Sequence, residues 1–256
     1  MILNSRIIGS SQKKIIILHG LLGSLDNWIT FGKKISNEGF EVHLVDQRNH
    51  GLTFHHNDHD YNLMAIDLYN YIMSHSLDRY SIIGHSMGGK VAMQFAFKNP
   101  DNINKLIIVD IAPKRYIDSH SNIFQGLNKV LHNAQSRKDA FSILLSSIQD
   151  QEVTTFLLKG LSFSDTTNQP RLKYNLNALE MNINNLMKEI TSDSKYTKPI
   201  YFISGSNSNY INEIDVQYIA NLFNDYTIIT VKDAGHWVQH ENKDDFMIAL
   251  NKLLKS

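Results

Sequence analysis

The stretch YSIIGHSMGG at Tyr80–Gly89 constrains the fold of this chain more than any other segment. Its first four residues form an apolar run with the length and composition of a buried strand. The next residues match G-x-S-x-G around Ser86, and the run from Met87 to Lys98 has the apolar content of a largely buried helix. A strand, a sharp turn with serine at its apex and a helix are the setting of a nucleophile elbow. We therefore predict that Ser86 is a nucleophile in an α/β protein.

Small residues are required on both sides of such a serine. A side chain at Gly84 or Gly88 would collide where the backbone turns sharply. The same segment has an alternative interpretation, because Gly84 to Lys90 also matches G-x-x-x-x-G-K, the start of a phosphate-binding loop. That loop needs Ser or Thr at the next position to hold magnesium, and Val91 stands there. We interpret the match as accidental.

Length and composition set further bounds. A chain of 256 residues can build one large α/β domain, or a domain with an insertion. Twenty-five basic and twenty-five acidic residues cancel, so nothing favours nucleic acid or an anionic membrane as a partner. The lack of cysteine excludes disulfides, thiolate catalysis and cysteine-based zinc sites. No cationic leader and no apolar run near the roughly 20 residues of a membrane span are visible. We expect a soluble cytoplasmic protein, and its oligomeric state stays open.

Apolar runs predict a central sheet, because strands covered on both faces have continuous apolar sequences. The predicted strands are Ile15–Leu18, Phe40–Val45, Tyr80–Ile83, Asn104–Val109, Pro199–Ile203 and Tyr226–Val231. Helical patterns separate them, at Leu25–Asn37, Asn62–Ser76, Met87–Lys98, Ile214–Phe223 and Lys243–Leu254. This alternation predicts a mostly parallel sheet flanked by helices.

The segment from 114 to 197 interrupts this alternation with helical patterns and loops rich in Ser, Asn and Asp. We predict a helical cap at 114–197, inserted into a sheet domain formed by 1–113 and 198–256. Four apolar residues of the cap could line an acyl pocket or belong to the cap core: Leu157, Leu158, Leu161 and Phe163. For each of them taken singly, the core is the expected place.

The oxyanion hole is expected at the turn HGLLGS, His19–Ser24, which directly follows a predicted buried strand. Glycine-rich backbone at this place can approach a ligand closely. In serine hydrolases such a turn supplies one N–H donor, and the residue after the nucleophile supplies the other. The candidates are the backbone N–H groups of Leu21 and Met87.

A serine hydroxyl needs a general base, and histidine titrates in the required range. Among twelve histidines, His236 stands in a short turn after the last predicted strand, at the same sheet edge as Ser86. His19 and His85 flank the oxyanion turn and the nucleophile, so their rings are expected to pack locally. His240 falls in or near the final helix. We therefore choose His236 as the base.

The base needs a carboxylate that fixes its tautomer. The loop after the predicted strand 199–203 offers only Ser and Asn, and Asp215, the next acid, is expected on a solvated helix. Asp110 ends a buried run one strand earlier, where α/β sheets place their ligands, so we choose it as the acid. Asp233 lies too close to His236 along the chain and is expected to be a turn residue. A hydroxyl from Ser206 or Ser208 could support the Asp110–His236 pair.

The loop after the second predicted strand carries a dense set of polar residues. Arg48 and His50 are expected to hold this loop near the site through hydrogen bonds rather than to act in catalysis. The next residues suggest a metal site, but histidines in such a loop are expected to be solvated and no cooperating ligand pair is evident. We therefore assign no metal to this cluster, which consists of His55, His56, Asp58, His59 and Asp60.

The motifs together resemble the α/β-hydrolase fold superfamily, and more narrowly the small YbfF-type esterases related to abhydrolase domain-containing protein 11. The motifs that carry the resemblance are HGLLGSLDNW, DQRNHG, GHSMGGKVAM, DIAP and DAGHWV. The resemblance implies a carboxylester or acyl-thioester hydrolase that uses no cofactor, and it supports Asp110, which lies in DIAP, as the acid.

Other activities stay open beside this one. A carbon–carbon bond hydrolase or a lyase of the same fold would keep the same three residues, and a ligand-binding module with a vestigial site is a further alternative. The serine at the elbow argues against dehalogenases and epoxide hydrolases, which use an aspartate nucleophile.

Overall fold

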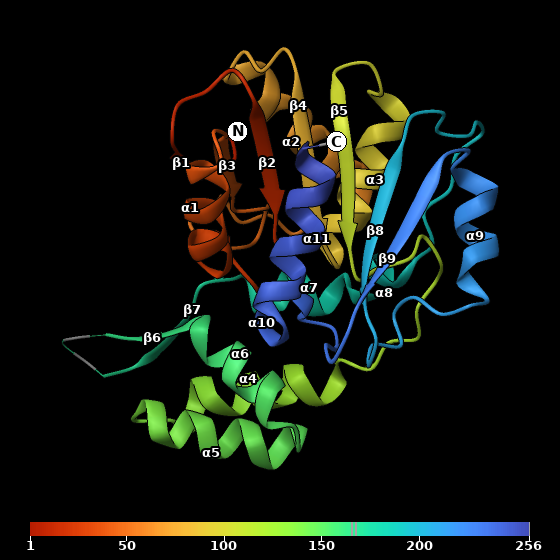
Figure 1. The fold of residues 1–256 in the computed structure, drawn as a ribbon. Helices are drawn as coiled ribbons and strands as arrows, with labels where there is room; N and C mark the ends of the chain where they lie inside the picture. Colours follow the sequence, from red (N-terminus) through yellow and green to blue (C-terminus); the bar gives the residue numbers. More distant parts are fainter. Residues whose placement is uncertain (165, 167, 256) are drawn as a thin grey trace.

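The computed structural model describes residues 1–164, 166 and 168–255, and these residues form one seven-stranded sheet and a small two-stranded one (Figure 1). The strand order in the large sheet is β1-β3-β2-β4-β5-β8-β9. All neighbouring strands run parallel except β1, which pairs antiparallel with β3. The strands are β1 (Ser5–Ile8), β2 (Lys14–Leu18), β3 (Glu41–Val45), β4 (Tyr80–His85), β5 (Ile103–Val109), β8 (Ile200–Gly205) and β9 (Tyr226–Val231).

Six of these strands confirm the apolar runs in the sequence, whereas β1 was not predicted. It has four residues, all at least partly accessible, so no buried run marks it. Its place on the edge comes from pairing with β3, in which Ser5 lies opposite Val45 and Ile8 opposite Val42. An edge strand buries little of its surface, and its sequence therefore carries a weak signal.

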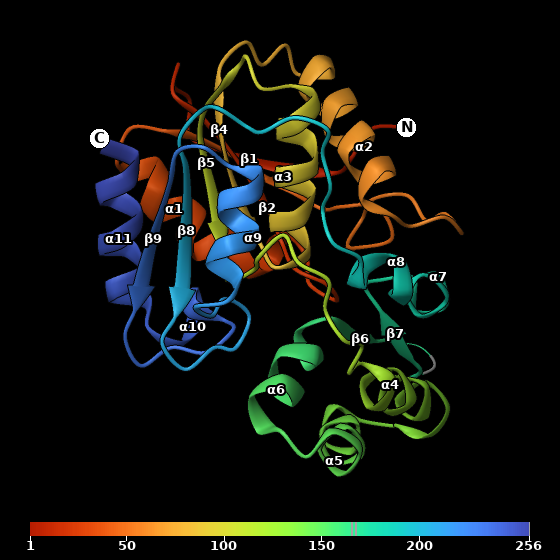
Figure 2. The ribbon, with the colours of Figure 1, turned by 90° about the vertical axis from the view of Figure 1, so that its right-hand side faces the viewer.

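Helices cover both faces of the sheet and bury two apolar layers (Figure 2). One face packs against α2 (Tyr61–Ser74), α3 (Met87–Lys98) and α9 (Asp215–Leu222). The other packs against α1 (Ile29–Asn37) and α11 (Lys243–Lys255), with the short α10 (Val238–Glu241) before it. Alternate residues of β2 enter opposite layers, which explains its continuous apolar sequence. No helix in the described ranges combines the length and apolar content needed to cross a bilayer.

One predicted helix differs from the structure at its start. The helix expected over Leu25–Asn37 begins as a 3-10 turn, η1 (Leu25–Trp28), before α1. His240 lies in α10, directly before the final helix, as expected.

The segment between β5 and β8 leaves the sheet and folds over the carboxyl ends of its strands (Figures 1 and 2). Its elements are α4 (Ser121–Asn133), α5 (Arg137–Ile148), α6 (Gln151–Lys159), β6 (Leu161–Phe163), β7 (Pro170–Leu172), α7 (Leu176–Met181) and α8 (Ile183–Met187). The inserted helical cap is confirmed, and it also contains an antiparallel hairpin of β6 and β7 that was not predicted. The exact domain limits at 113/114 and 197/198 stay a prediction, and residues 165, 167 and 256 fall outside the described residues.

The turn between β4 and α3 depends on the two predicted glycines. A Cβ added at Gly84 would collide with the carbonyl oxygen of Gly88. A Cβ at Gly88 would lie 2.5 Å from the carbonyl oxygen of Leu18 and 2.7 Å from that of His19. The backbone of α3 therefore touches the end of β2 directly, and this contact fixes the start of the helix above the sheet.

We predict that Gly88→Ala lowers the free energy of unfolding by about 1–3 kcal/mol, since both clashing groups are backbone atoms and cannot rotate away. Urea denaturation followed by circular dichroism measures the loss. Gly39→Ala is the comparison, because a Cβ there meets no atom within 4 Å and any loss comes from its φ of +91° alone. Equal stability of Gly88→Ala and the parent chain would contradict the proposed contact.

Candidate active site

Ser86 lies at the apex of the turn between β4 and α3. Its backbone has φ 52° and ψ −119°, a combination that non-glycine residues rarely adopt. The Ser86 N–H donates to the carbonyl of Val109 (3.0 Å), which ties the turn to β5. Strained backbone that is held by its surroundings is typical of functional turns. The strand–turn–helix setting predicted for this serine is thus present.

His236 and Asp110 complete a chain of hydrogen bonds that begins at Ser86. The imidazole Nε2 lies 3.0 Å from Ser86 Oγ, and Nδ1 lies 2.8 Å from Asp110 Oδ2. Because a carboxylate only accepts, Nδ1 carries the proton and donates to it, which leaves Nε2 free to accept from the serine hydroxyl. The three side chains come from the turns after β4, β5 and β9. The structure therefore brings together the three residues chosen from the sequence, in a geometry that can move a proton off Ser86.

The Asp110 carboxylate is fully buried and accepts three hydrogen bonds. Besides His236, the Gly205 N–H donates to Oδ1 (3.1 Å) and the Ser208 hydroxyl donates to Oδ2 (2.5 Å). The predicted contact of Ser208 is therefore present. Ser206 takes no part, since its hydroxyl oxygen accepts from the Asp233 N–H (2.9 Å). These donors offset the cost of burying the charge and fix the carboxylate in place.

The expectation that Asp215 lies on a solvated helix was wrong. Its residue is 2% exposed, and its carboxylate Oδ2 pairs with Lys114 Nζ at 2.6 Å. It also accepts from the N–H of Asn212, which lies shortly before α9 (2.9 Å). Lys114 lies 101 positions earlier, directly after the loop that follows Asp110. Asp215 therefore joins α9 to that loop and does not contact His236.

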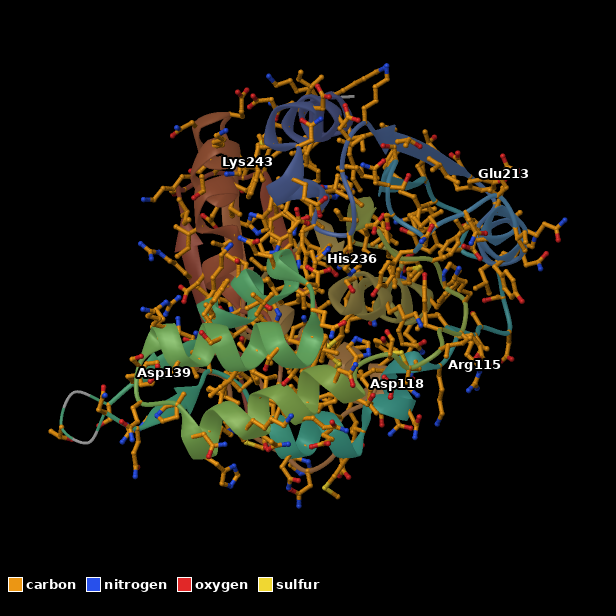
Figure 3. All side chains as sticks on the ribbon, turned by 90° about the horizontal axis from the view of Figure 1, so that it is seen from below. Arg115, Asp118, Asp139, Glu213, His236 and Lys243 are labelled. Carbon is orange, nitrogen blue, oxygen red and sulfur yellow. The ribbon has the colours of Figure 1, made fainter. Side chains whose placement is uncertain are left out.

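Two further side chains hold His236, and sequence analysis did not assign them this role. The Tyr210 ring stacks on the imidazole with centroids 3.7 Å apart and planes 15° apart. The buried His85 ring donates from Nε2 to the His236 carbonyl oxygen (2.9 Å). Burial lowers the pKa of His85 well below its usual value, so a neutral ring stands beside His236. Figure 3, seen from the cap side, shows His236 near the centre of the face.

Leu21 and Met87 frame the space beside Ser86, and both line the same cavity as the serine. Met87 is the first residue of α3, so its N–H has no acceptor within the helix. In the described part of the chain the Leu21 N–H donates to no protein group. The two N–H groups are therefore available as oxyanion donors, the role predicted for them.

Two buried imidazoles support the loop that contains Leu21. The Leu22 N–H donates to His50 Nε2 (3.1 Å), and His50 Nδ1 in turn donates to the Arg48 carbonyl oxygen (2.9 Å). His19 accepts from the Gln47 N–H (3.1 Å) and donates to the Gly20 carbonyl oxygen (2.8 Å). Each acceptor nitrogen exists only in the neutral ring, and burial lowers the pKa of both histidines. The local packing of His19 and the supporting role of His50 are thus confirmed.

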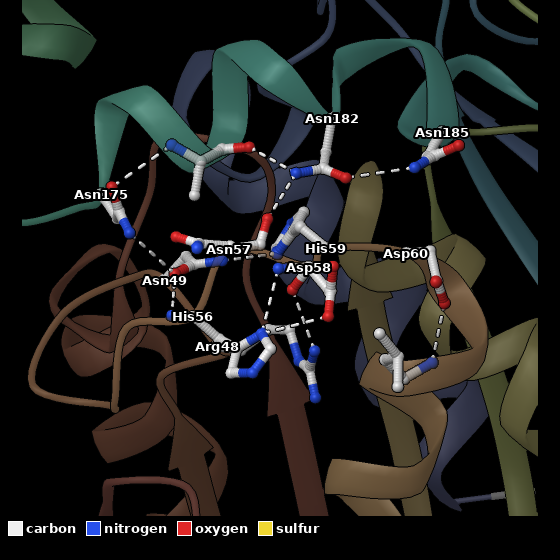
Figure 4. Close-up of polar contacts among 12 residues, drawn as sticks. Arg48, Asn49, His56, Asn57, Asp58, His59, Asp60, Asn175, Asn182 and Asn185 are labelled. Atoms are coloured by element: carbon white, nitrogen blue, oxygen red, sulfur yellow. Dashed lines mark hydrogen bonds and ion pairs between the residues drawn. The ribbon is translucent and has the colours of Figure 1, made fainter.

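Arg48 also has the structural role expected of it. Its guanidinium makes two bonds to the buried Asp67 carboxylate, of 2.5 and 3.0 Å, and a third to the Asp58 carbonyl oxygen (3.0 Å). Figure 4 shows how this loop also binds the cap, where Asn182 donates to the carbonyl oxygen of Asn57 (2.7 Å).

The adjacent His55 and His56 are exposed, as expected, whereas His59 in the same polar cluster is not. His59 is fully buried and Asp60 caps α2 by accepting from the Leu63 N–H (2.9 Å). Asp58 is exposed, and its N–H donates to His56 Nδ1 (3.0 Å). Within residues 1–164, 166 and 168–255 no three such side chains gather as a metal site would require. The side chains of this cluster therefore have separate partners and do not converge on one point.

Two cavities meet at Ser86. We call the first the cap cavity, of about 310 Å³; its apolar wall includes Ile123, Ile148, Val153, Phe156, Leu157 and Trp237. We call the second the Lys90 cavity, of about 250 Å³; its wall includes Tyr61, Met87, Lys90, Ile111, Tyr116 and Met187. Of the four cap residues singled out above, Leu157 lines the cap cavity, Leu158 and Leu161 are buried in the core, and Phe163 packs against it.

Comparisons with known proteins match nearly the whole chain to hydrolases of one fold family. The sequence model of the family described as the alpha/beta hydrolase fold matches residues 13–243, a range that spans Ser86, Asp110 and His236. Esterase YbfF of Escherichia coli is 33% identical over 248 residues, covering 95% of this chain and 94% of that protein. The sn-1-specific diacylglycerol lipase ABHD11 of Mus musculus is also 33% identical, covering 94% and 80%. The solved structure of a marine microorganism esterase superimposes with a TM-score of 0.93 at 37% identity, covering 98% and 99%.

We predict that acid weakens the fold through His59. Burial, with Arg48 nearby, lowers the pKa of this imidazole to about 3, whereas the unfolded chain takes up the proton near 6.5. Between these two pKa values, unfolding binds a proton at His59. The contribution of His59 to the free energy of unfolding is therefore complete above pH 6.5 and is lost as the pH falls. His59→Phe should reduce the loss of unfolding free energy between pH 7 and pH 5 by about 2 kcal/mol.

Urea denaturation at pH 5, 6 and 7 measures this difference, with the exposed His132→Phe as the matched control. The same pH dependence in the parent chain and in His59→Phe would contradict the prediction.

Proposed function

The chain is a carboxylesterase-type hydrolase of the α/β-hydrolase fold family, and from this membership we propose that it cleaves carboxylic esters through an acyl-enzyme on Ser86. The observation that carries the proposal is the unbroken chain of contacts from Ser86 Oγ through His236 to Asp110 (3.0 and 2.8 Å). The proposed substrates are small-molecule esters, or acyl thioesters, with small to medium acyl groups.

In the proposed acylation, Ser86 Oγ forms a bond to the acyl carbon and its proton passes to His236 Nε2. Asp110 holds the ring in the tautomer that can accept this proton and stabilises the imidazolium. The tetrahedral intermediate then breaks its bond to the alcohol oxygen, which takes the proton from Nε2. The acyl group remains on Ser86.

Deacylation repeats these steps with water. Water gives its proton to His236 Nε2 and its oxygen bonds to the acyl carbon; the Ser86 oxygen then leaves with that proton. In both steps the Leu21 and Met87 N–H groups receive the negative oxygen, and one such donor is typically worth about 3–4 kcal/mol of barrier. The reaction as proposed uses only groups of this chain and water.

We expect purified protein to hydrolyse p-nitrophenyl esters from acetate to decanoate. Ser86→Ala should lower kcat by about 10⁴–10⁶-fold, because no other group can form the acyl-enzyme. Release of p-nitrophenol measures both, and the dependence on chain length gives the size of the acyl pocket.

A phosphonate ester that labels the active serine is the control, with the Ser86→Ala protein as its blank. A parent chain that hydrolyses no ester of the series would overturn the esterase proposal. Turnover of a ketone substrate would then favour a carbon–carbon bond hydrolase or a lyase, and failure to label Ser86 would favour a binding role.

The acid is tested by a pair of matched substitutions. Asp110→Asn should lower kcat by about 10²–10⁴-fold, since the amide can hold His236 in the wrong tautomer. Asp215→Asn should leave kcat near that of the parent and lower the free energy of unfolding by about 1–3 kcal/mol, because it leaves Lys114 without its carboxylate. Steady-state kinetics and thermal denaturation of both proteins measure this. Full activity of Asp110→Asn together with inactivity of Asp215→Asn would sink the assignment.

A further inference from the structure

The two cavities at Ser86 differ in their relation to the base. His236 lines the cap cavity but not the Lys90 cavity, whereas Met87 lines the Lys90 cavity alone. Leu21, Ser86 and Tyr210 line both. An ester has two arms that diverge from the reacting carbonyl, so two cavities that meet at the serine can each receive one arm.

The chemistry of the leaving group decides which arm lies where, given the function proposed above. The alcohol oxygen takes its proton from His236 Nε2 and must therefore stay within hydrogen-bond reach of that ring. This places the alcohol arm in the cap cavity. The acyl arm then extends into the Lys90 cavity, past the N–H groups of Leu21 and Met87.

The wall of the Lys90 cavity carries a buried amine. Lys90 lies four residues after Ser86 in α3, so the two residues share a face of the helix about one turn apart. Its residue is only 1% exposed, and Nζ donates to the Lys188 carbonyl oxygen (2.5 Å). The ammonium also lies 4.8 Å from the centre of the Tyr116 ring and 5.5 Å from that of Tyr61.

The aromatic neighbours of this amine are held in fixed positions. The Tyr61 hydroxyl donates to the Leu186 carbonyl oxygen (2.7 Å). The Tyr116 hydroxyl donates to the Tyr210 carbonyl oxygen (2.6 Å) and accepts from the Ala112 N–H (2.9 Å). The rings therefore form walls that restrict where the amine can point.

No carboxylate forms an ion pair with Lys90 in the part of the chain that the structure describes, although the negative charge of Glu189 favours the ammonium from farther away. Glu189, adjacent to Lys188 in the sequence, pairs instead with Arg115 at 2.9 Å on the surface. Burial lowers the pKa of Lys90 to about 7. An ammonium has three donors, and one carbonyl oxygen satisfies only one of them. A buried amine with no carboxylate paired to it is a costly way to tie Lys188 to α3, which favours a role toward a ligand in the cavity.

We propose that Lys90 is a specificity-determining residue, selecting acyl groups that carry a ketone or carboxylate oxygen roughly three to five atoms beyond the reacting carbonyl carbon. The amine donates a hydrogen bond to that oxygen while Ser86 attacks the ester carbonyl. Acyl groups that consist only of hydrocarbon leave these donors unsatisfied, and their transition states gain less stabilisation.

A positional series of esters tests this in the parent chain without any substitution. The substrates are the p-nitrophenyl esters of heptanoate and of its 4-oxo, 5-oxo and 6-oxo derivatives, with p-nitrophenyl hydrogen adipate as the charged acceptor. At least one acceptor position should raise kcat/KM about tenfold or more over heptanoate, as expected of a hydrogen bond to a charged donor. A flat profile across the series overturns the proposal.

Lys90→Met then tests the residue, because methionine keeps most of the length of the side chain and removes the amine. The ratio of kcat/KM between the best acceptor ester and heptanoate should fall to within about twofold of 1. Lys98→Met is the matched control; it makes the same change at an exposed position of the same helix and should keep the parent ratio. A Lys90→Met protein that keeps the parent ratio overturns the proposal and leaves Lys90 with a purely structural role.

The two proposals fail in different ways. A parent chain inert toward all five esters overturns the esterase proposal and the role of Lys90 with it. A parent chain that hydrolyses heptanoate through Ser86, without preference for any acceptor ester, overturns the role of Lys90 alone.

Discussion

The buried carboxylate of Asp110 is the constraint on which the geometry of the site depends. It is fully buried and accepts from His236, Gly205 and Ser208, which lie at or after the ends of two other strands. A buried charge is stable only while such donors surround it, so the loops after β8 and β9 have little freedom to move away from it. Each of these loops starts where a parallel strand ends. The sheet therefore fixes the position of the His236 ring relative to Ser86.

A second polar layer keeps the loop with Leu21 in place. It uses His19 and His50 as neutral rings, each accepting a backbone N–H and donating to a backbone carbonyl. The ion pair of Arg48 with Asp67 holds the next part of the same layer. A neutral imidazole can donate and accept at once, which suits a buried position where both kinds of backbone group need partners. Their neighbours distinguish these rings from the proposed base, because among the described residues only the His236 ring contacts both a carboxylate and Ser86.

The cap covers Ser86 and leaves two cavities beside it whose linings differ. One cavity has aromatic side chains in its wall, with Phe156 of the cap packed on Trp237 of the core at 5.1 Å between ring centres. The other contains the amine of Lys90 between two tyrosine rings. The fold family leaves the identity of the substrate open, and differences of this kind between pockets are what set it.

The sequence by itself determined the parallel sheet, the elbow around Ser86, and the choice of Asp110 and His236 at the same sheet edge. These follow from local signals, because a buried strand needs an apolar run and a sharp turn needs glycine. Tertiary structure alone decided the edge strand β1, the hairpin β6–β7, the burial of Asp215 against Lys114 and the surroundings of Lys90. The hairpin is local, but its strands of three residues are too short to give a pattern. The other features depend on contacts between residues far apart in the chain, and periodicity along a sequence carries no record of such partners.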